Sequence, residues 1–129
     1  MSDYTTLHAT TKNLLEDASD ALASFKALND AAMDAGKRRY GLSRMPQDLK
    51  EGLRREYRKI EDTYERLRPL NDDFIALCVV ADRVRANGGS PRTPMSRPIP
   101  GGGYAALSLA ECQRRLQRKV REVMSAGGF

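Results

Sequence analysis

A chain of 129 residues is long enough for one domain and too short for two of ordinary size. With a hydrophobic fraction of 40%, a charged fraction of 30% and no Trp, its composition favours elongated helices over a thick globular core. The longest apolar run is far shorter than a membrane span and the first residues lack the pattern of a signal peptide, so we expect a soluble intracellular protein, in the cytoplasm or alternatively the nucleus.

The net charge of +5 is distributed unevenly along the chain. Residues 1–36 carry two Lys and six acidic residues, whereas residues 37–68 carry eleven Lys or Arg and six acidic residues. Residues 90–129 are again basic, with seven Lys or Arg and two acidic residues. Acidic and basic segments that are adjacent in sequence can face each other across a helical hairpin, and we favour this use of the charge over nucleic-acid binding.

A first helix is predicted over residues 4–36, approximately. Apolar or small residues recur along it in alternating steps of four and three, which is the pattern of a coiled-coil seam. These positions are Leu7, Thr11, Leu14, Ala18, Ala21, Phe25, Leu28, Ala32 and Ala35. Gly36 is the predicted end of the helix, and the basic segment KRRYGLSR is the predicted connection to the next one.

A second, longer helix is predicted over residues 46–87, with Pro46 in its first turn. Pro69 lies inside its apolar pattern, although an interior proline costs about 3 kcal/mol. Two interpretations remain open: Pro69 kinks one continuous helix, or it begins a new helix. The seam favours the kink because it keeps its phase through Pro69, at Leu53, Tyr57, Ile60, Tyr64, Leu67, Asn71, Phe74, Cys78 and Ala81.

Residues 88–103, GGSPRTPMSRPIPGGG, are predicted to form a flexible linker, because their Gly and Pro cannot sustain a helix or a central strand. Residues 104–129 then contain a short amphipathic helix. Ser108 and Glu111 have the spacing of a capping box at its start, and the pair Gly127-Gly128 is the predicted end.

The sequence offers few residues for catalysis. His8 is the only histidine and has no cysteine or carboxylate at metal-ligand spacing, so we expect a surface residue and no metal site. Cys78 and Cys112 are too few for a disulfide framework, and we expect reduced, buried thiols. No nucleotide-binding glycine motif is present, and Ser or Cys nucleophiles lack the usual base. We therefore predict no catalytic residue, no cofactor and no enzymatic activity.

Two segments resemble a known family. The stretch Phe25-Lys-Ala-Leu-Asn, then Tyr40, then Thr63-Tyr-Glu-Arg-Leu-Arg-Pro-Leu-Asn-Asp-Asp-Phe-Ile-Ala-Leu77, is similar to subunit two of the lysosome-related organelle biogenesis complex. The resemblance implies a non-enzymatic subunit of an elongated hetero-oligomer that acts in positioning endosomes and lysosomes. The order of helices and linker is also similar to small head-module subunits of the transcriptional Mediator complex, which would imply a nuclear protein.

The sequence thus predicts an all-α protein: a long antiparallel, coiled-coil-like helical hairpin, a Gly/Pro linker and a short amphipathic C-terminal helix that docks on the hairpin or on a partner. We predict a scaffold or adaptor subunit of a multi-protein assembly, a homo- or hetero-oligomer held together by other helical chains packed on the seam. The predicted partner-binding residues are Leu14, Phe25, Leu28, Leu53, Ile60, Leu67, Phe74, Leu77, Leu109, Leu116 and Val120.

The alternative function is that of a basic accessory protein that contacts nucleic acid through residues 113–121. Few aromatic residues accompany this basic segment, so base stacking has little support. The candidate anion-binding residues are Arg114, Arg115, Arg118, Lys119 and Arg121.

Overall fold

The structure is a computed structural model, and it describes residues 3–86, 88 and 108–129. Within these ranges the chain forms three helices and no strand: α1 (Asp3–Tyr40), α2 (Gln47–Ala86) and α3 (Leu109–Ala126). The prediction of an all-α protein is therefore confirmed. Most of the predicted linker, and the first residues of the predicted C-terminal segment, lie outside the described residues.

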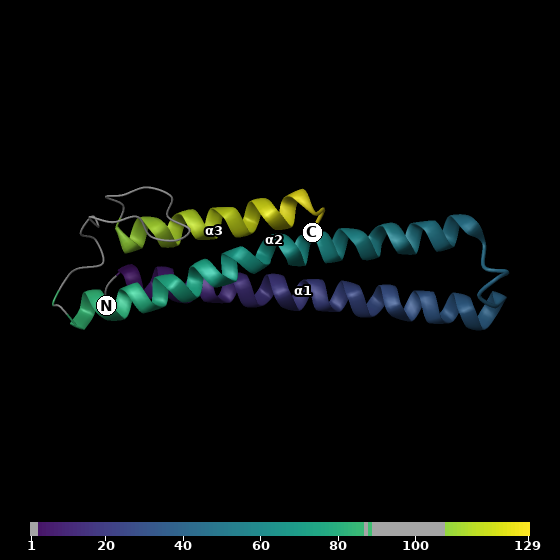
Figure 1. The fold of residues 1–129 in the computed structure, drawn as a ribbon, viewed down its shortest axis with the longest axis horizontal. Helices are drawn as coiled ribbons and strands as arrows, with labels where there is room; N and C mark the ends of the chain where they lie inside the picture. The colour runs from purple at the N-terminus through teal and green to yellow at the C-terminus, as the bar shows by residue number, and fades with distance from the viewer. Residues whose placement is uncertain (1–2, 87, 89–107) are drawn as a thin grey trace.

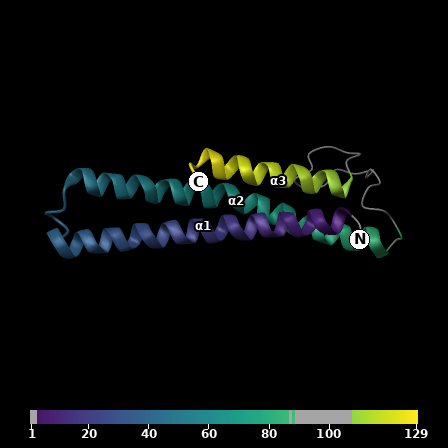
Figure 2. The ribbon, with the colours of Figure 1, turned by 180° about the vertical axis from the view of Figure 1, so that it is seen from behind.

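The two long helices, α1 and α2, lie side by side and run in opposite directions (Figure 1). His8, near the start of α1, contacts Phe74, near the end of α2, at a ring-centroid distance of 4.8 Å. Gly36, near the end of α1, packs against Met45, just before α2 begins. The third helix lies along only one half of this pair, in both views of the molecule (Figures 1 and 2).

α1 ends at Tyr40, whereas the sequence analysis placed its end at Gly36. Gly36 is buried, and a Cβ added there would lie 3.0 Å from Cε of Met45, so this glycine allows close packing inside the helix. Gly41 terminates the helix instead: its φ is 79°, and its N–H donates to the backbone oxygen of Lys37 at 2.8 Å. A left-handed residue just after the last turn is the usual helix terminator, and glycine adopts it without steric cost.

α2 is one continuous helix, with Pro69 inside it. Of the two interpretations left open by the sequence, a new helix beginning at Pro69 is therefore excluded. Pro69 is exposed, whereas Leu67 and Leu70 on either side of it are buried. The backbone oxygen that loses its helical partner at Pro69 belongs to Glu65, another exposed residue, so water can replace the missing hydrogen bond. Figure 1 shows that α2 curves along its length.

The molecule divides into a three-helix part and a two-helix part. We call residues 3–25, 59–86 and 108–129 the body, and residues 26–58 the arm. All the buried hydrophobic residues except Met45 lie in the body, where α3 covers the other two helices. Among the described residues, α1 and α2 of the arm pack against each other and against Met45 of the connection, so each helix keeps much of its surface in water.

The start of α3 confirms the predicted capping box. The backbone N–H of Glu111 donates to Oγ of Ser108 at 3.2 Å, and the backbone N–H of Ser108 donates to Oε1 of Glu111 at 3.4 Å. Gly127 caps the other end, as predicted. Substituting such a Ser cap typically costs about 1 kcal/mol, so local sequence specifies both ends of α3.

Candidate helix-binding surfaces

Buried amide side chains fix the position of α3 on α1. Gln117 is 6% exposed, and its Nε2 donates to the backbone oxygen of Leu7 and to Oγ1 of Thr11, both at 3.0 Å. Thr11 in turn donates from Oγ1 to the backbone oxygen of Leu7 at 2.8 Å. A shift of α3 along α1 would leave the Gln117 amide unpaired inside the core, which costs about 1–3 kcal/mol. This network therefore specifies the register of the body.

A second polar layer surrounds His8. Its ring stacks on Phe74 of α2, its Nδ1 lies 3.2 Å from Nε2 of Gln113 in α3, and its Nε2 lies 3.9 Å from Sγ of Cys78 in α2. His8 thus contacts both other helices and is only partly exposed. The expectation of a surface histidine is wrong, because α2 and α3 together cover a position that helix α1 alone would leave in water.

Burial determines the protonation of this layer. It lowers the pKa of the His8 imidazole, and the nearby charge of Arg85 lowers that pKa further. Burial also raises the pKa of the Tyr4 hydroxyl and of the Cys78 thiol. Each shift favours the neutral form of its group, and the thiol is not activated as a nucleophile.

The buried groups beside His8 are incompletely paired. Oη of Tyr4 and Oε1 of Gln113 have no hydrogen-bond partner among the described residues. The side chain of Gln113 lies close to the Tyr4 hydroxyl and partly offsets the rise in the pKa of that hydroxyl. The geometry of the two groups is nevertheless not that of a hydrogen bond. Cys78 and Cys112 are free cysteines, and of the two only Cys112 is fully buried, whereas burial was expected for both. Burial raises the pKa of Cys112 as well. Across residues 3–86, 88 and 108–129, no group of three or more His, Cys, Asp or Glu side chains could hold a metal ion.

The predicted partner-binding residues lie in three environments. Six are at most 2% exposed and fill the core of the body: Ile60, Leu67, Leu77, Leu109, Leu116 and Val120. Three are partly buried: Leu14, Leu53 and Phe74. The remaining two, Phe25 and Leu28, are 45% and 67% exposed. The six core residues pack against helices of their own chain, so in this fold only the exposed pair is fully available to another protein.

Phe25 and Leu28 continue a stripe that α3 covers in the body. In that stripe Leu7 and Thr11 contact Gln117 of α3, and Phe25 contacts the ring of Phe129, just after α3, at a centroid distance of 5.0 Å. The positions that follow in steps of three and four are all exposed: Leu28, Ala32 and Ala35. α3 therefore ends where the stripe is still apolar.

The facing positions on α2 are also left open beyond α3. Thr63 packs against Gly127, just after the end of α3. Lys59 packs against the next two residues, Gly128 and Phe129. Gly52 lies two turns further along the same face, and within the described part of the chain no neighbouring atom comes within 4 Å of the position of a Cβ there. We call this uncovered surface the front slot, formed by Phe25, Leu28, Ala32 and Ala35 of α1 and by Gly52, Glu56 and Lys59 of α2.

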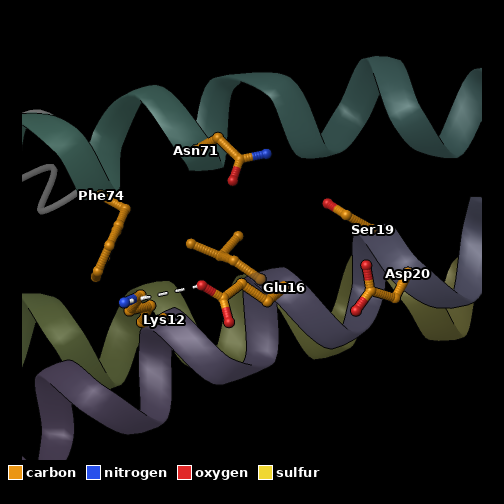
Figure 3. Close-up of a pocket in the computed structure, with 7 residues that line it drawn as sticks. Lys12, Glu16, Ser19, Asp20, Asn71 and Phe74 are labelled. Carbon is orange, nitrogen blue, oxygen red and sulfur yellow. Dashed lines mark ion pairs between the residues drawn. The ribbon is translucent and has the colours of Figure 1, made fainter.

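The side of the α1–α2 pair that faces away from α3 carries a long groove. Three clefts of about 410, 350 and 270 Å³ lie along it, and no residue of α3 lines any of them. Figure 3 shows the first cleft, with α3 behind the two helices that line it. The clefts are lined among others by residues at steps of three, four or seven on both helices: Lys12, Glu16, Ser19, Lys26, Asp30 and Met33 of α1, and Arg54, Tyr57, Glu61, Tyr64, Arg68 and Asn71 of α2. Leu15, Leu53, Leu67 and Phe74 add apolar surface to the clefts.

We call this surface the back groove. The common spacing places its three clefts on one continuous face of the helix pair. On α2 the groove follows positions of the predicted seam, such as Tyr57, Tyr64 and Asn71. On α1 it follows mainly charged and polar residues, which an apolar pattern does not include.

The predicted anion-binding residues of α3 do not all face solvent. Arg114, Arg118 and Arg121 are exposed and lie on one face of the helix, in steps of four and three. Arg115 and Lys119 are half-buried, and each makes interactions within the chain. The charge of Lys119 acts on Asp73, whose pKa burial raises and Lys119 lowers. The basic face of α3 is therefore narrower than the sequence suggests.

None of α1, α2 and α3 contains an apolar stretch that is sufficient to cross a bilayer. No protein-family model matches the sequence, and comparisons with curated proteins and with solved structures find no match either.

Proposed function

We propose that this protein is a non-enzymatic scaffold or adaptor that binds an amphipathic helix of another protein in the front slot. The observation that carries the proposal is the exposure of Leu28, at 67%, on the stripe that α3 covers in the body. The partner helix would take the place in the arm that α3 takes in the body. An intracellular location, in the cytoplasm or the nucleus, is part of this proposal.

Packing energetics support the front slot as a binding surface. Full burial of a Leu or Phe side chain contributes about 1.5–3 kcal/mol, so covering Leu28 and Phe25 would stabilise a complex appreciably. The neighbouring positions Ala32, Ala35 and Gly52 carry little or no side chain, so a third helix could approach both long helices closely. The slot extends from Phe25 to Ala35, a rise of about 15 Å, which matches a partner helix of about three turns.

The apolar stripe of α1 is covered in the body and exposed in the arm. A coiled-coil-like hairpin that binds a helical partner through its arm would have this distribution. The sequence resemblance to subunit two of the lysosome-related organelle biogenesis complex supports the same role, since that family acts as non-enzymatic subunits of an elongated assembly. A two-helix arm also buries too little apolar surface for high stability by itself, so a partner would stabilise it.

The test is affinity purification of the intact protein from its native cells, with co-purifying proteins quantified by mass spectrometry. Leu28→Glu places a charge in the front slot, whereas Ala27→Glu places the same charge on the adjacent exposed residue outside it. We expect Leu28→Glu to reduce the recovery of the partner at least tenfold and Ala27→Glu to leave it unchanged. Equal recovery with both variants, or recovery of no partner by the unmodified protein, would refute the proposal.

A second candidate function is binding of nucleic acid through α3, and the exposure of Arg114, Arg118 and Arg121 on one face favours it. Three phosphate contacts would give a slope of log K against log salt of about −2.7 on duplex DNA. Replacing the three arginines by Ala should abolish this slope if they carry the binding. This function is excluded if the unmodified protein is not retained on DNA at moderate salt. It is also excluded if the triple variant is retained as strongly as the unmodified protein.

A further inference from the structure

The two walls of the back groove carry opposite charges at two successive levels. At one level Lys26 of α1 faces Glu61 of α2, with Nζ 3.6 Å from Oε1. About one turn nearer the end of the arm, Asp30 of α1 shares a cleft with Arg54 and Arg58 of α2. The sign of the charge on each wall therefore reverses between the two levels.

Most other charges of the back groove are paired along one helix. Glu65 and Arg68 of α2 form an ion pair at 2.8 Å, and Lys12 and Glu16 of α1 form one at 3.9 Å (Figure 3). Asp20 is the remaining charge at the first cleft. Lys26 and Glu61 are paired as well, but across the groove, so their charges still lie on opposite walls. Asp30 on one wall and Arg54 and Arg58 on the other therefore contribute most to the charge pattern that an approaching surface meets.

A surface with this pattern is complementary to itself. A twofold axis parallel to the groove places α1 of one copy over α2 of the other at the same level. Lys26 then faces Glu61 of the second copy, and Asp30 faces Arg54 and Arg58 of the second copy. A shift by one level would bring Lys26 against those two arginines, so the reversal of sign also penalises other registers.

Exposed apolar side chains lie on the same face. Tyr57, which lines the groove, is 39% exposed. Ile75 and Val79 follow the groove residue Asn71 at intervals of four along α2, and they are 62% and 47% exposed. Their burial against a second molecule would add an apolar contribution to the charge pairs.

The size of the back groove is sufficient for a stable interface. From Lys12 to Met33 it extends about 32 Å at the rise of an α-helix, and two packed helices are about 20 Å wide. Each copy would bury about 640 Å², or about 1,300 Å² in total, which lies at the lower end of the range of specific interfaces.

We propose that the back groove binds the back groove of a second copy of this chain, giving a four-helix contact between two molecules about a twofold axis parallel to α1 and α2. The front slot lies on the other face and stays open in this dimer. This proposal and the proposed function can therefore fail independently.

The test is sedimentation velocity of the intact chain over a range of concentrations, with a pair of complementary variants. Asp30→Arg places three positive charges at one level, and Arg54→Asp combined with Arg58→Asp places three negative charges there. We expect the unmodified chain to dimerise and each variant alone to dissociate at least tenfold more readily. An equimolar mixture of the two variants should dimerise again, because the arginine introduced in one molecule would then meet the acidic residues introduced in the other.

Two controls separate this contact from general effects of charge and folding. Asp17→Arg makes the same charge change at an exposed position outside the groove, and it should leave dimerisation unchanged. Ile75→Arg should weaken the dimer without altering the charges of the arm, while circular dichroism reports that the helices remain. An unmodified chain that is monomeric at all concentrations, or a mixture that fails to recover the dimer, would contradict the proposal.

Discussion

At the scale of single residues, the exposure of an apolar side chain depends on whether it lies in the body, which includes α3, or in the arm, which α3 does not cover. Leu116 is 0% exposed in the body and Leu28 is 67% exposed in the arm, although their spacing in the sequence is typical of the same kind of seam. Leu116 therefore stabilises the fold of the chain itself, and Leu28 is available for contacts with another molecule.

Alanine substitutions at these two positions should differ strongly in their effect on stability. Leu116→Ala leaves a cavity in a close-packed core and should lower the free energy of unfolding by about 2–5 kcal/mol. Leu28→Ala removes a solvent-exposed side chain and should change it by less than about 0.5 kcal/mol. Urea denaturation followed by circular dichroism measures both values. Similar losses for the two variants would mean that Leu28 is part of the core.

His8 should make the stability of the body depend on pH. Burial lowers its pKa in the folded chain below the ordinary value of 6.5, so the unfolded chain binds more protons just below that pH. The free energy of unfolding should therefore fall as the pH decreases from about 6.5 until the lower folded pKa is reached.

Replacement of this single histidine separates its effect from that of carboxylates, which titrate at lower pH. His8→Gln should flatten the dependence between about pH 7.5 and pH 5.5, measured as the midpoint of thermal unfolding. An unchanged dependence in His8→Gln would show that His8 does not contribute.

At the scale of the helices, local signals could be predicted from the sequence and the contacts between helices could not. The capping box of Ser108 and Glu111 lies within one turn, so its spacing alone predicted the start of α3. The end of α1 was placed too early because the role of Gly36 depends on Met45, a residue of the following connection. The environment of His8 depends on two other helices, and no spacing within α1 contains that information.

Replacing Gly52 or Gly127 by Ala should change the free energy of unfolding in opposite directions. Gly52→Ala adds a methyl group in open space within α2 and should raise the free energy of unfolding by about 0.5–1 kcal/mol. Gly127→Ala adds one against Oγ1 of Thr63, which already donates to the backbone oxygen of Lys59 at 2.7 Å. That crowding should lower the free energy of unfolding by about 1–3 kcal/mol.

Thermal unfolding of both glycine variants beside the unmodified chain measures this difference. An increase in stability for Gly127→Ala would mean that the residues after α3 are not packed against Thr63. A decrease for Gly52→Ala would mean that the front slot is already filled at that position.

At the scale of the whole molecule, the central feature is that one short helix closes one half of a long helix pair. The sequence predicted the apolar stripes, but it assigned residues of the body, such as Leu67 and Leu77, to contacts with partners. Those residues lie in the hydrophobic core of the chain itself, with exposures of 1% and 0%. The exposed part of the apolar stripe is therefore concentrated in the arm, and the body folds around its own core.

Hydrogen exchange of backbone amides tests this division most directly. Measuring it in the Asp30→Arg variant as well as in the unmodified chain separates it from the proposed self-association. We predict that amides of α2 in the arm exchange at least about tenfold faster than those of α2 in the body, a difference of about 1.4 kcal/mol in local opening. Uniform protection along α1 and α2 would contradict the account, because the arm would then be as stable with two helices as the body is with three.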